Sequence, residues 1–454
     1  MSDLNCYITT FNCGREVVNI DYFASNFFNG AKLELPPDFI VLCLQEVAPL
    51  GYSFLGGSLL APYYACFTQA VLDATASRFG EDKTYGSVIT REVGMTAIMV
   101  FARQEVQPRI RWVETGGVGV GVLELGNKGA VGVRVGVKNG DGDDETRLSF
   151  VAAHLAPMEE KWQQRNEDWQ TICENLVFER IPTIGQSIEQ VDPIGEGESE
   201  PLLSSRDDAA SSEPSISTMF DPPSYLFFAG DLNYRTSDEP PSPDDPKSWP
   251  QPAEKSSDPQ HYSNFLPKDQ LSREKAKGNT LHHLAEAPVA FPPTYKYSKA
   301  AQKQVAHTTR SKKRTQADGR VNEITYIKPQ GDEEDVWLWA EHRVPSWCDR
   351  ILFLNEARPT VHSYTALPVQ PTSDHRPVAL SCSVSPKKMG EVSMPSHFEV
   401  REDWKERRAA ARRYEIAVGL GAYLGLTWEG EALLLGTVVG IIGGYLILRT
   451  LLAS

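Results

Sequence analysis

The stretch YLFFAGDLNYR (residues 225–235) joins a short apolar run to polar residues that follow it at once. An uninterrupted run of leucine and aromatic residues is typical of a strand that is buried on both faces. Asp231 and Asn233 then stand where the strand ends. A carboxylate and an amide in this position lie at the edge of a sheet, where polar residues from other strands can join them.

Runs of this kind recur over the first 385 residues and alternate with helical patterns. The best helix spans Glu159–Arg180, in which Trp162 and Trp169 belong to an apolar series at helical spacing. So many strands with interspersed helices favour an α/β sandwich, and no glycine-rich dinucleotide-binding motif follows a strand. The predicted strands are Asn5–Phe11, Asp38–Leu44, Thr96–Phe101, Ala130–Val137, Leu148–Ala153, Leu226–Ala229, Ile351–Leu354 and Val378–Val384.

Polar residues stand at the ends of several predicted strands. Asparagine, carboxylates and histidine without cysteine are the ligands of a hard, oxygen-preferring ion such as Mg²⁺ rather than of zinc. A histidine beside carboxylates can also balance charge on a phosphate or move protons. Any one of these residues alone is more often a turn residue, so the hypothesis depends on their number. The residues are Asn12, Glu46, His154, Asp231, Asn233, Asp349, Asp374 and His375.

The composition excludes several classes of protein. The 454 residues include 45 Lys and Arg against 60 Asp and Glu, a net charge of −15, which argues against a nucleic-acid binder. Seven scattered cysteines form no CxxC pair, so we expect reduced thiols rather than a disulfide scaffold or a zinc ribbon. The N-terminus shows no basic region followed by an apolar run, so a secretory signal is not expected.

The last part of the chain predicts a membrane anchor. Residues 432–448, ALLLGTVVGIIGGYLIL, carry no charge and are just long enough for a spanning helix, which needs about 17–25 apolar residues. A buried core helix is the alternative. Gly436, Gly440 and Gly444 recur in four-residue steps, a spacing that permits close helix packing in lipid and leaves an anchor-mediated dimer open.

A second apolar stretch, residues 416–428, precedes the anchor and is too short to cross a membrane unaided. We expect it at the membrane interface, with a two-stretch hairpin as the alternative. Four arginines between 407 and 413 stand on its N-terminal side, so the positive-inside rule places the preceding chain in the cytoplasm. The expected organisation is a catalytic domain at 1–385, a linker and basic helix at 386–415, and a membrane anchor at 416–454.

Two stretches interrupt the folded pattern. Residues 189–224 are rich in acidic residues, serine and glycine, and residues 237–260 hold seven prolines and six acidic residues. Both are predicted to be disordered loops because they hold little apolar surface to bury. Lys296–Arg320, in contrast, holds eight Lys and Arg and one acid. It is either a solvated loop or a segment that meets anionic lipid.

Taken together, AGDLNYR, VPSWCDRIL and TSDHRPV resemble the signature of the inositol polyphosphate 5-phosphatases, part of the endonuclease/exonuclease/phosphatase superfamily. The resemblance implies a DNase I-like fold, a four-layer sandwich of two packed mixed β-sheets flanked by helices, here with a C-terminal transmembrane helix. With this helix the chain resembles the fungal-type, tail-anchored phosphatidylinositol 4,5-bisphosphate 5-phosphatases. The supporting motifs, in the same order, are GNKGAVGVR (126–134), AAHLAPMEEKWQQRNEDW (152–169), DQLSREKAKG (269–278) and FPPTYKY (291–297).

The resemblance implies roles for the strand-end residues. Asp231 would orient or deprotonate the attacking water, and Asn233 would position the scissile phosphate. His375 would stabilise the charge of an in-line displacement, with Asp349 holding its ring, and His154 would also face the phosphate.

The resemblance also implies a metal site and a substrate site. Glu46, with help from Asn12, would bind Mg²⁺, and Asp374 would lie in the metal shell or just outside it. Recognition of a second phosphate calls for fixed cations and a hydroxyl. The residues implied for the neighbouring 4-phosphate and the same cleft are Tyr295, Lys296, Arg350, Asn127 and Lys128.

Three departures from the family pattern leave the ranking of substrates open. TFN stands where TWN is more common, and HLAPM stands where HLAAH is common. His342 occupies a place before PSWCDR that is often lysine, so one cation near the phosphates would be weaker at neutral pH.

The sequence thus predicts a Mg²⁺-dependent phosphatase that removes the 5-phosphate of phosphatidylinositol 4,5-bisphosphate at the cytoplasmic face of the endoplasmic reticulum. Soluble inositol polyphosphates are further candidate substrates. Two other functions stay open: another reaction of the superfamily, by a nuclease or a sphingomyelinase, and a membrane-tethered adaptor that binds phosphoinositide without turnover. The mitochondrial outer membrane is the alternative location.

Overall fold

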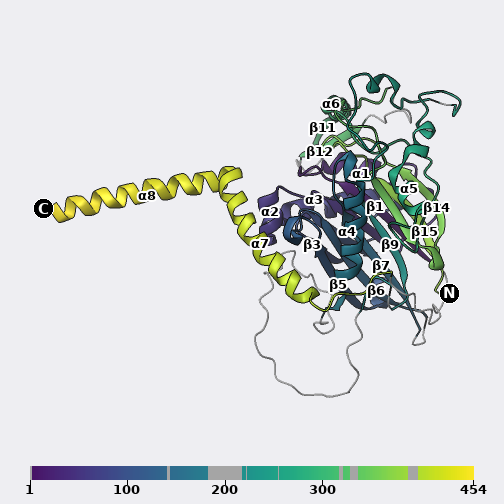
Figure 1. Cartoon of the computed structure of the whole chain (residues 1–454), viewed down its shortest axis with the longest axis horizontal. Coiled ribbons are helices and arrows are strands. Elements are labelled where there is room, and N and C mark those ends of the chain that lie inside the picture. The colour runs from purple at the N-terminus through teal and green to yellow at the C-terminus, as the bar shows by residue number, and fades with distance from the viewer. Residues whose placement is uncertain are drawn as a thin grey trace, which may run out of the picture.

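The computed structural model places two β-sheets face to face at the centre of the molecule, with helices on their outer faces (Figure 1). A long C-terminal helix extends away from this body. The residues that the structure describes are 3–140, 144–181, 217–220, 222–253, 255–315, 321–327, 336–386 and 397–453.

The first sheet has the strand order β14-β15-β1-β2-β4-β3. β1 and β2 are parallel, and the other neighbours are antiparallel. The central strands are buried on both faces, which explains their continuous apolar runs. The strands are β1 (Leu4–Asn12), β2 (Phe39–Gln45), β3 (Tyr85–Val93), β4 (Thr96–Arg103), β14 (Thr360–Ala366) and β15 (Val378–Val384).

The second sheet has the order β10-β13-β9-β7-β6-β5-β8, in which only β7 and β9 are parallel among its described strands. It contains the strand with which the sequence analysis began. The strands are β5 (Ile110–Gly119), β6 (Gly129–Lys138), β7 (Glu145–His154), β8 (Glu179–Arg180), β9 (Tyr225–Asp231), β10 (Leu284–Glu286) and β13 (Asp349–Leu354). All eight strands predicted from the sequence are confirmed in the two sheets.

The four layers follow from where the side chains of successive residues point. One large apolar core lies between the sheets and includes Phe150 and Phe227, whose rings stack at 5.6 Å. On the opposite face of β9, Phe228 meets Trp169 of α4 (Trp162–Asn175) with ring centroids 5.2 Å apart. A second core packs α1 (Ile20–Asn26) and α3 (Ala61–Phe79) on the first sheet. The four-layer sandwich is therefore confirmed.

The helix predicted over Glu159–Arg180 is shorter than expected. A 3-10 turn covers Glu159–Lys161, α4 ends at Asn175, and the chain then extends into β8, which pairs with β5. Val177 and Phe178 are buried in this extended segment, and the Phe178 ring lies under the Arg134 guanidinium. Tertiary burial of these strand-forming residues outweighs the helical spacing.

Of the two predicted disordered loops, most of 189–224 lies outside the described residues. The prediction for 237–260 is wrong in the part that the structure describes. Trp249 is buried, Gln251 exchanges two hydrogen bonds with the backbone of Trp337, and the Trp339 indole donates to Pro250 O at 2.7 Å. A tryptophan gives this loop an apolar anchor, and prolines reduce the entropy that ordering costs.

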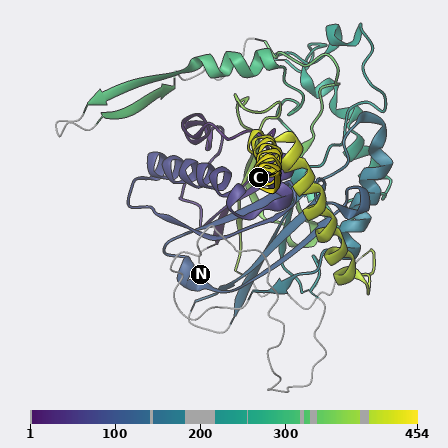
Figure 2. The ribbon, with the colours of Figure 1, turned by 90° about the vertical axis from the view of Figure 1, so that its left-hand side faces the viewer.

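The basic stretch Lys296–Arg320 is not a simple loop. It contributes α6 (Lys299–Thr308) and β11 (Thr309–Thr315), which pairs with β12 (Val321–Ile327) in a two-stranded hairpin. Figure 2 shows the hairpin extending away from the sheets.

The C-terminal region forms α7 (Trp404–Leu426) and α8 (Trp428–Ala453). In α8, Trp428–Leu452 is long and apolar enough to span a membrane, and none of its most apolar window is buried. The basic stretch and the first apolar stretch form one helix, α7, which runs across the expected boundary between 415 and 416. It lies against α2 (Leu50–Leu55) and α8 leaves it at an angle (Figures 1 and 2). The anchor-mediated dimer stays a prediction.

Candidate active site

A pocket of about 570 Å³ opens where strands of the two sheets end side by side. Parallel pairing of β7 with β9 sets His154 opposite Asp231, and antiparallel pairing of β13 with β9 sets Asp349 opposite the same residue. β1 and β2 end together in the first sheet, at Asn12 and Gln45. The residues predicted from the sequence that line the pocket are Asn12, Glu46, Asn127, Lys128, His154, Asp231, Asn233, Tyr295, Lys296, Asp374 and His375.

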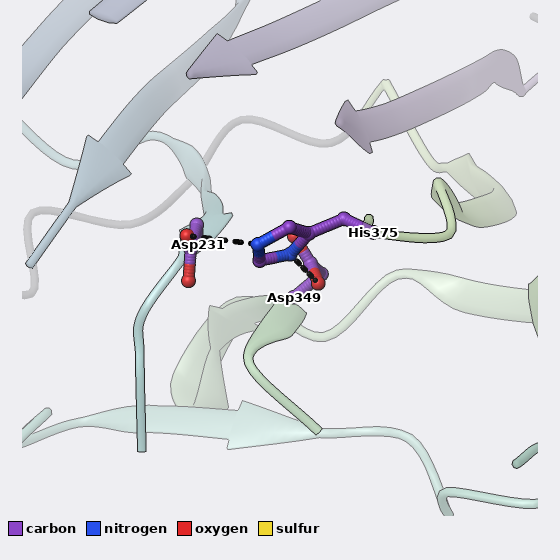
Figure 3. Close-up of side chains that lie close together, drawn as sticks. All are labelled: Asp231, Asp349 and His375. Carbon is purple, nitrogen blue, oxygen red and sulfur yellow. Dashed lines mark hydrogen bonds and ion pairs between the residues drawn. The ribbon is translucent and has the colours of Figure 1, made fainter. Parts of the chain in front are cut away.

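The imidazole of His375 lies between two buried carboxylates (Figure 3). Its Nδ1 is 2.9 Å from Asp349 Oδ2, and its Nε2 is 3.8 Å from Asp231 Oδ2. Asp349 Oδ2 also accepts a 2.7 Å hydrogen bond from the Thr294 hydroxyl. Burial disfavours the imidazolium, but Asp349 and Asp231 outweigh burial and raise the pKa of His375 to about 9. His375 is therefore positively charged at neutral pH.

Asp231 is the most contacted acid of the pocket. Its Oδ2 accepts a 2.9 Å hydrogen bond from Asn12 Nδ2 and lies 3.3 Å from His154 Nε2. Burial alone would raise the pKa of Asp231, but His375, His154 and Lys128 hold it far below its usual range. The carboxylate therefore stays ionised. It can accept hydrogen bonds, but it is a weak base.

The pKa of His154 is shifted in the opposite direction from the pKa of His375. Burial and the neighbouring Lys128 ammonium lower the pKa of His154, so its imidazole is neutral. The Lys128 ammonium contacts His154 Nε2 and lies 3.8 Å from Glu46 Oε1. One histidine of the pocket is therefore charged and the other is not.

Three residues of the pocket have left-handed backbone conformations, which L side chains rarely adopt, and one of them is Arg15 with φ +66°. Glu46 has φ +47° and Asn233 has φ +57°. Glu46 Oε2 accepts a 2.7 Å hydrogen bond from Arg15 Nε, and Asn233 Nδ2 donates to Leu155 O at 3.1 Å. Burial alone would raise the pKa of Glu46, but His154, Lys128 and Arg15 outweigh burial and lower the pKa, so this carboxylate is ionised. Such conformations cluster at functional sites, where they aim a side chain.

The other side of the pocket is formed by Tyr295, Lys296 and Asp374. The Tyr295 ring lies 4.5 Å from the His375 ring, centroid to centroid. Lys296 Nζ forms a 2.6 Å ion pair with Asp374 Oδ2, and both side chains are about one quarter exposed. A flexible ammonium at the mouth of the pocket can therefore reach a bound anion.

Residues 9–381 match the model of endonuclease/exonuclease/phosphatase family 2. The chain belongs to this family.

Its curated relatives are inositol phosphate and phosphoinositide phosphatases. Inositol-1,4,5-trisphosphate 5-phosphatase 1 of Schizosaccharomyces pombe is 26% identical over 70% of this chain and 21% of that protein. Human phosphatidylinositol 3,4,5-trisphosphate 5-phosphatase 1 is 28% identical over 65% of this chain and 19% of that protein. Type II inositol polyphosphate 5-phosphatase 14 of Arabidopsis thaliana is 25% identical over 75% of this chain and 27% of that protein. The chain thus spans about a quarter of their length or less.

A solved structure confirms the DNase I-like fold. The inositol polyphosphate 5-phosphatase domain of synaptojanin, crystallised with inositol (1,4)-bisphosphate and a calcium ion, is 20% identical. The match covers 91% of this chain and 90% of the synaptojanin chain, with a TM-score of 0.55. The resemblance inferred from the motifs is therefore confirmed for the family and the fold.

One residue that was predicted to bind the substrate does not line the pocket. Arg350 was expected to bind a phosphate, but its guanidinium is 2% exposed and pairs with Glu286 and Asp269 at 2.6 and 3.1 Å. Side chains alternate along a strand, so Asp349 points toward His375, behind the pocket lining, and its neighbour Arg350 points the other way. The prediction for Arg350 is wrong.

Two pocket cations were missed in the sequence. Arg235 and Arg15 both line the pocket. The Arg235 guanidinium lies 4.5 Å from the centroid of the Tyr295 ring, and its Nη1 has no hydrogen-bond partner among the described residues. Arg235 is the last residue of the stretch AGDLNYR, so the motif itself contained the signal.

The donor atoms of the pocket fit a hard divalent cation. Glu46, Asp231 and Asp374 supply carboxylate oxygens, and no cysteine is among the described residues that line the pocket. Asp349 Oδ1 is also buried without a hydrogen-bond partner among the described residues. Oxygen-rich sets of this kind suit Mg²⁺ or Ca²⁺.

Proposed function

We propose that the chain is a Mg²⁺-dependent phosphatase that removes the 5-phosphate of phosphatidylinositol 4,5-bisphosphate. The observation that supports this proposal best is the pairing of charged His375 with ionised Asp231 in a pocket rimmed by lysine and arginine. A phosphate ester needs cations for its non-bridging oxygens and an acceptor for the hydrogen of the attacking water. The names of the relatives point to the same class of substrate.

The protein's own side chains divide the reaction between them. Asp231 would accept a hydrogen bond from the attacking water and fix its direction; its low pKa makes it an orienting group more than a base. His375, held by Asp349, would donate to a phosphate oxygen as negative charge develops. Asn233 and neutral His154 would position the same phosphate from the side of β7 and β9.

The metal would be held by Glu46, with Asn12 and Asp374 close to it. When bound, Mg²⁺ neutralises phosphate charge and lowers the pKa of a coordinated water. One or two carboxylates together with substrate phosphate are the usual protein ligands of Mg²⁺.

The second phosphate of the substrate would meet the opposite wall of the pocket. Lys296 and Tyr295 supply an ammonium and a hydroxyl there, and Arg235 supplies the planar guanidinium that was expected from Arg350. Asn127 and Lys128 line the same cleft.

The membrane span supports a lipid as the substrate. A helix such as α8 would confine the enzyme to a surface, so a lipid headgroup is met at high effective concentration. The arginines that precede the span favour an orientation in which the catalytic domain lies in the cytoplasm. We place it at the endoplasmic reticulum because the span is only moderately apolar and is followed closely by Arg449.

The test is phosphate release by the full chain in detergent micelles that contain phosphatidylinositol 4,5-bisphosphate, with Mg²⁺ or with EDTA. We expect Mg²⁺-dependent formation of the 4-phosphate, lost in Asp231→Asn and kept in Asp244→Asn, whose side chain is 86% exposed. Thermal unfolding should show that both variants are folded. Turnover by Asp231→Asn equal to wild type would refute the proposal, and tight lipid binding without turnover would favour the adaptor.

A further inference from the structure

The juxtamembrane helix α7 is docked on the catalytic domain through glycines. A Cβ at Gly419 of α7 would lie 2.7 Å from the Phe54 Cβ, and a Cβ at Gly51 of α2 would lie 2.8 Å from the backbone nitrogen of Tyr423. Real side chains are almost never found at such distances. The two helices therefore touch at a close backbone contact that only glycine permits at these positions. Arg412 Nη1 also donates a 2.6 Å hydrogen bond to Phe54 O.

The docked helix reaches the candidate active site. Val418 of α7 lines the pocket beside Leu50 and Phe54 of α2. Val122 and Leu125, from the loop of residues 120–128, line it as well. These five side chains form an apolar wall in a pocket whose other lining residues are mainly polar.

A buried carboxylate joins α7 to this 120–128 loop. Glu415 is 6% exposed, and its Oε1 accepts a 2.8 Å hydrogen bond from the backbone nitrogen of Gly126. Its Oε2 accepts a 3.2 Å hydrogen bond from Arg412. At the tip of the loop, Arg407 of α7 forms an ion pair with Glu124. The loop is thus held from α7 at two separate points.

The loop carries two residues of the candidate site. Gly126 directly precedes Asn127 and Lys128, and its carbonyl accepts a 2.9 Å hydrogen bond from Met95 N. The Glu415 carboxylate therefore holds the Gly126 amide, while the turn between β3 and β4 holds the Gly126 carbonyl. A displacement of the loop would move the Lys128 ammonium relative to His154 and Glu46.

We propose that α7 is part of the active site: Glu415 is a positioning residue for the 120–128 loop, and Val418 completes an apolar wall for the glycerol and acyl part of a lipid substrate. This inference rests on the proposed phosphoinositide phosphatase activity for its substrate. The helix that leads to the membrane span is then more than a tether, because catalysis requires it to be docked.

The first test compares two glycines of the same helix in the full chain, purified in detergent. A Cβ at Gly421 meets nothing within 4 Å, so Gly421→Ala is the matched control for Gly419→Ala. We expect Gly419→Ala to lower kcat/KM by roughly tenfold, because misplacement of catalytic groups by about 1 Å can cost on the order of 100-fold. Gly421→Ala should leave it unchanged. Equal values for the two variants would overturn the proposal.

The second test separates positioning from general stability. Glu415→Gln keeps an oxygen that can accept from Gly126, whereas Glu415→Ala does not. We expect Glu415→Ala to raise KM for the lipid and Glu415→Gln to restore it to within about twofold of wild type. Thermal unfolding measured on both variants identifies any loss of fold. Equal KM values in wild type and a folded Glu415→Ala would count against positioning.

Hydrogen exchange gives a readout that does not depend on the substrate. Exchange of the Gly126 amide should rise by roughly tenfold or more in Glu415→Ala and in Gly419→Ala, since a hydrogen bond to a charged group is lost. It should not rise in Gly421→Ala. If wild-type enzyme released no phosphate from any lipid, the proposed activity would fail, and exchange alone would decide the docking of α7. Unchanged protection of Gly126 would overturn that docking.

Discussion

Arg350 offers a sharp test of how a charged residue beside a catalytic motif is used. Its guanidinium is 2% exposed and donates to both carboxylate oxygens of Glu286, from Nε at 2.7 Å and from Nη2 at 2.6 Å. A third hydrogen bond of 3.1 Å joins Nη1 to Asp269 Oδ2. Tyr364 also donates to Glu286, so the cluster is closed on itself. Arg350→Met keeps much of the volume but leaves two carboxylates without their cation.

The expected loss is large. Removing one partner of a buried ion pair costs about 3–5 kcal/mol, because the remaining charge stays buried and unpaired. We therefore expect the free energy of unfolding of Arg350→Met to fall by about 3–5 kcal/mol. At a temperature where the variant is still folded, its kcat/KM should stay close to that of wild type. The added substitution Glu286→Gln should recover part of the lost stability.

The measurement is urea unfolding of the full chain in detergent, followed by tryptophan fluorescence, beside phosphate release. Lys296→Met is the matched control, because the Lys296 side chain is one quarter exposed and its ammonium forms an ion pair with Asp374, which is also one quarter exposed. We expect it to cost about 1 kcal/mol or less and to lower phosphate release strongly. If Arg350→Met abolished phosphate release while costing under about 1 kcal/mol, Arg350 would be acting on the substrate and the reasoning would be wrong.

Three further predictions concern the loop of residues 237–260, the metal, and the close contact of Gly94 with Gly126. Trp249→Ala should lower the free energy of unfolding by about 3 kcal/mol in urea titrations, since the indole is buried; a change below about 0.5 kcal/mol would contradict its packing. Mg²⁺ at about 100 times its Kd should stabilise the wild type by about 2.7 kcal/mol in thermal unfolding, and Glu46→Gln should remove this gain. Gly94→Ala should destabilise the fold more than Gly57→Ala in the same assay: both have positive φ, but only the Gly94 Cβ would meet a carbonyl, at 2.3 Å. Equal losses would show that backbone strain alone matters.

The sequence revealed the buried strands because burial on both faces leaves a continuous apolar run. β3, β5 and β14 were missed for the complementary reason. Only two of the nine residues of β3, Tyr85 and Ile89, are buried, and β5 mixes arginine, glutamate and glycine with its apolar residues. These strands acquire their place from pairing with β4, β6 and β15, which a local pattern does not contain.

The candidate site could be predicted as a set of residues but not as an arrangement. Polar residues at the ends of apolar runs identified seven of the residues that line the pocket, and the family motifs identified four more, Asn127, Lys128, Tyr295 and Lys296. The sequence motif did not show on which face of β13 each side chain lies. Asp349 and Arg350 were therefore given neighbouring roles, although they point in opposite directions. Arg235 was passed over because a residue beyond a strand end has no fixed direction until the loop folds.

The two histidines show most clearly what only the folded chain supplies. His154 and His375 both stand at strand boundaries, and the sequence gives no reason to assign them different charges. In the structure, His375 has a carboxylate on each side, whereas His154 is fully buried and has the Lys128 ammonium beside it as well as Asp231. Opposite neighbours move the two pKa values in opposite directions. A single pocket can therefore offer a phosphate a ring that is cationic at neutral pH on one side and a neutral hydrogen-bonding ring on the other.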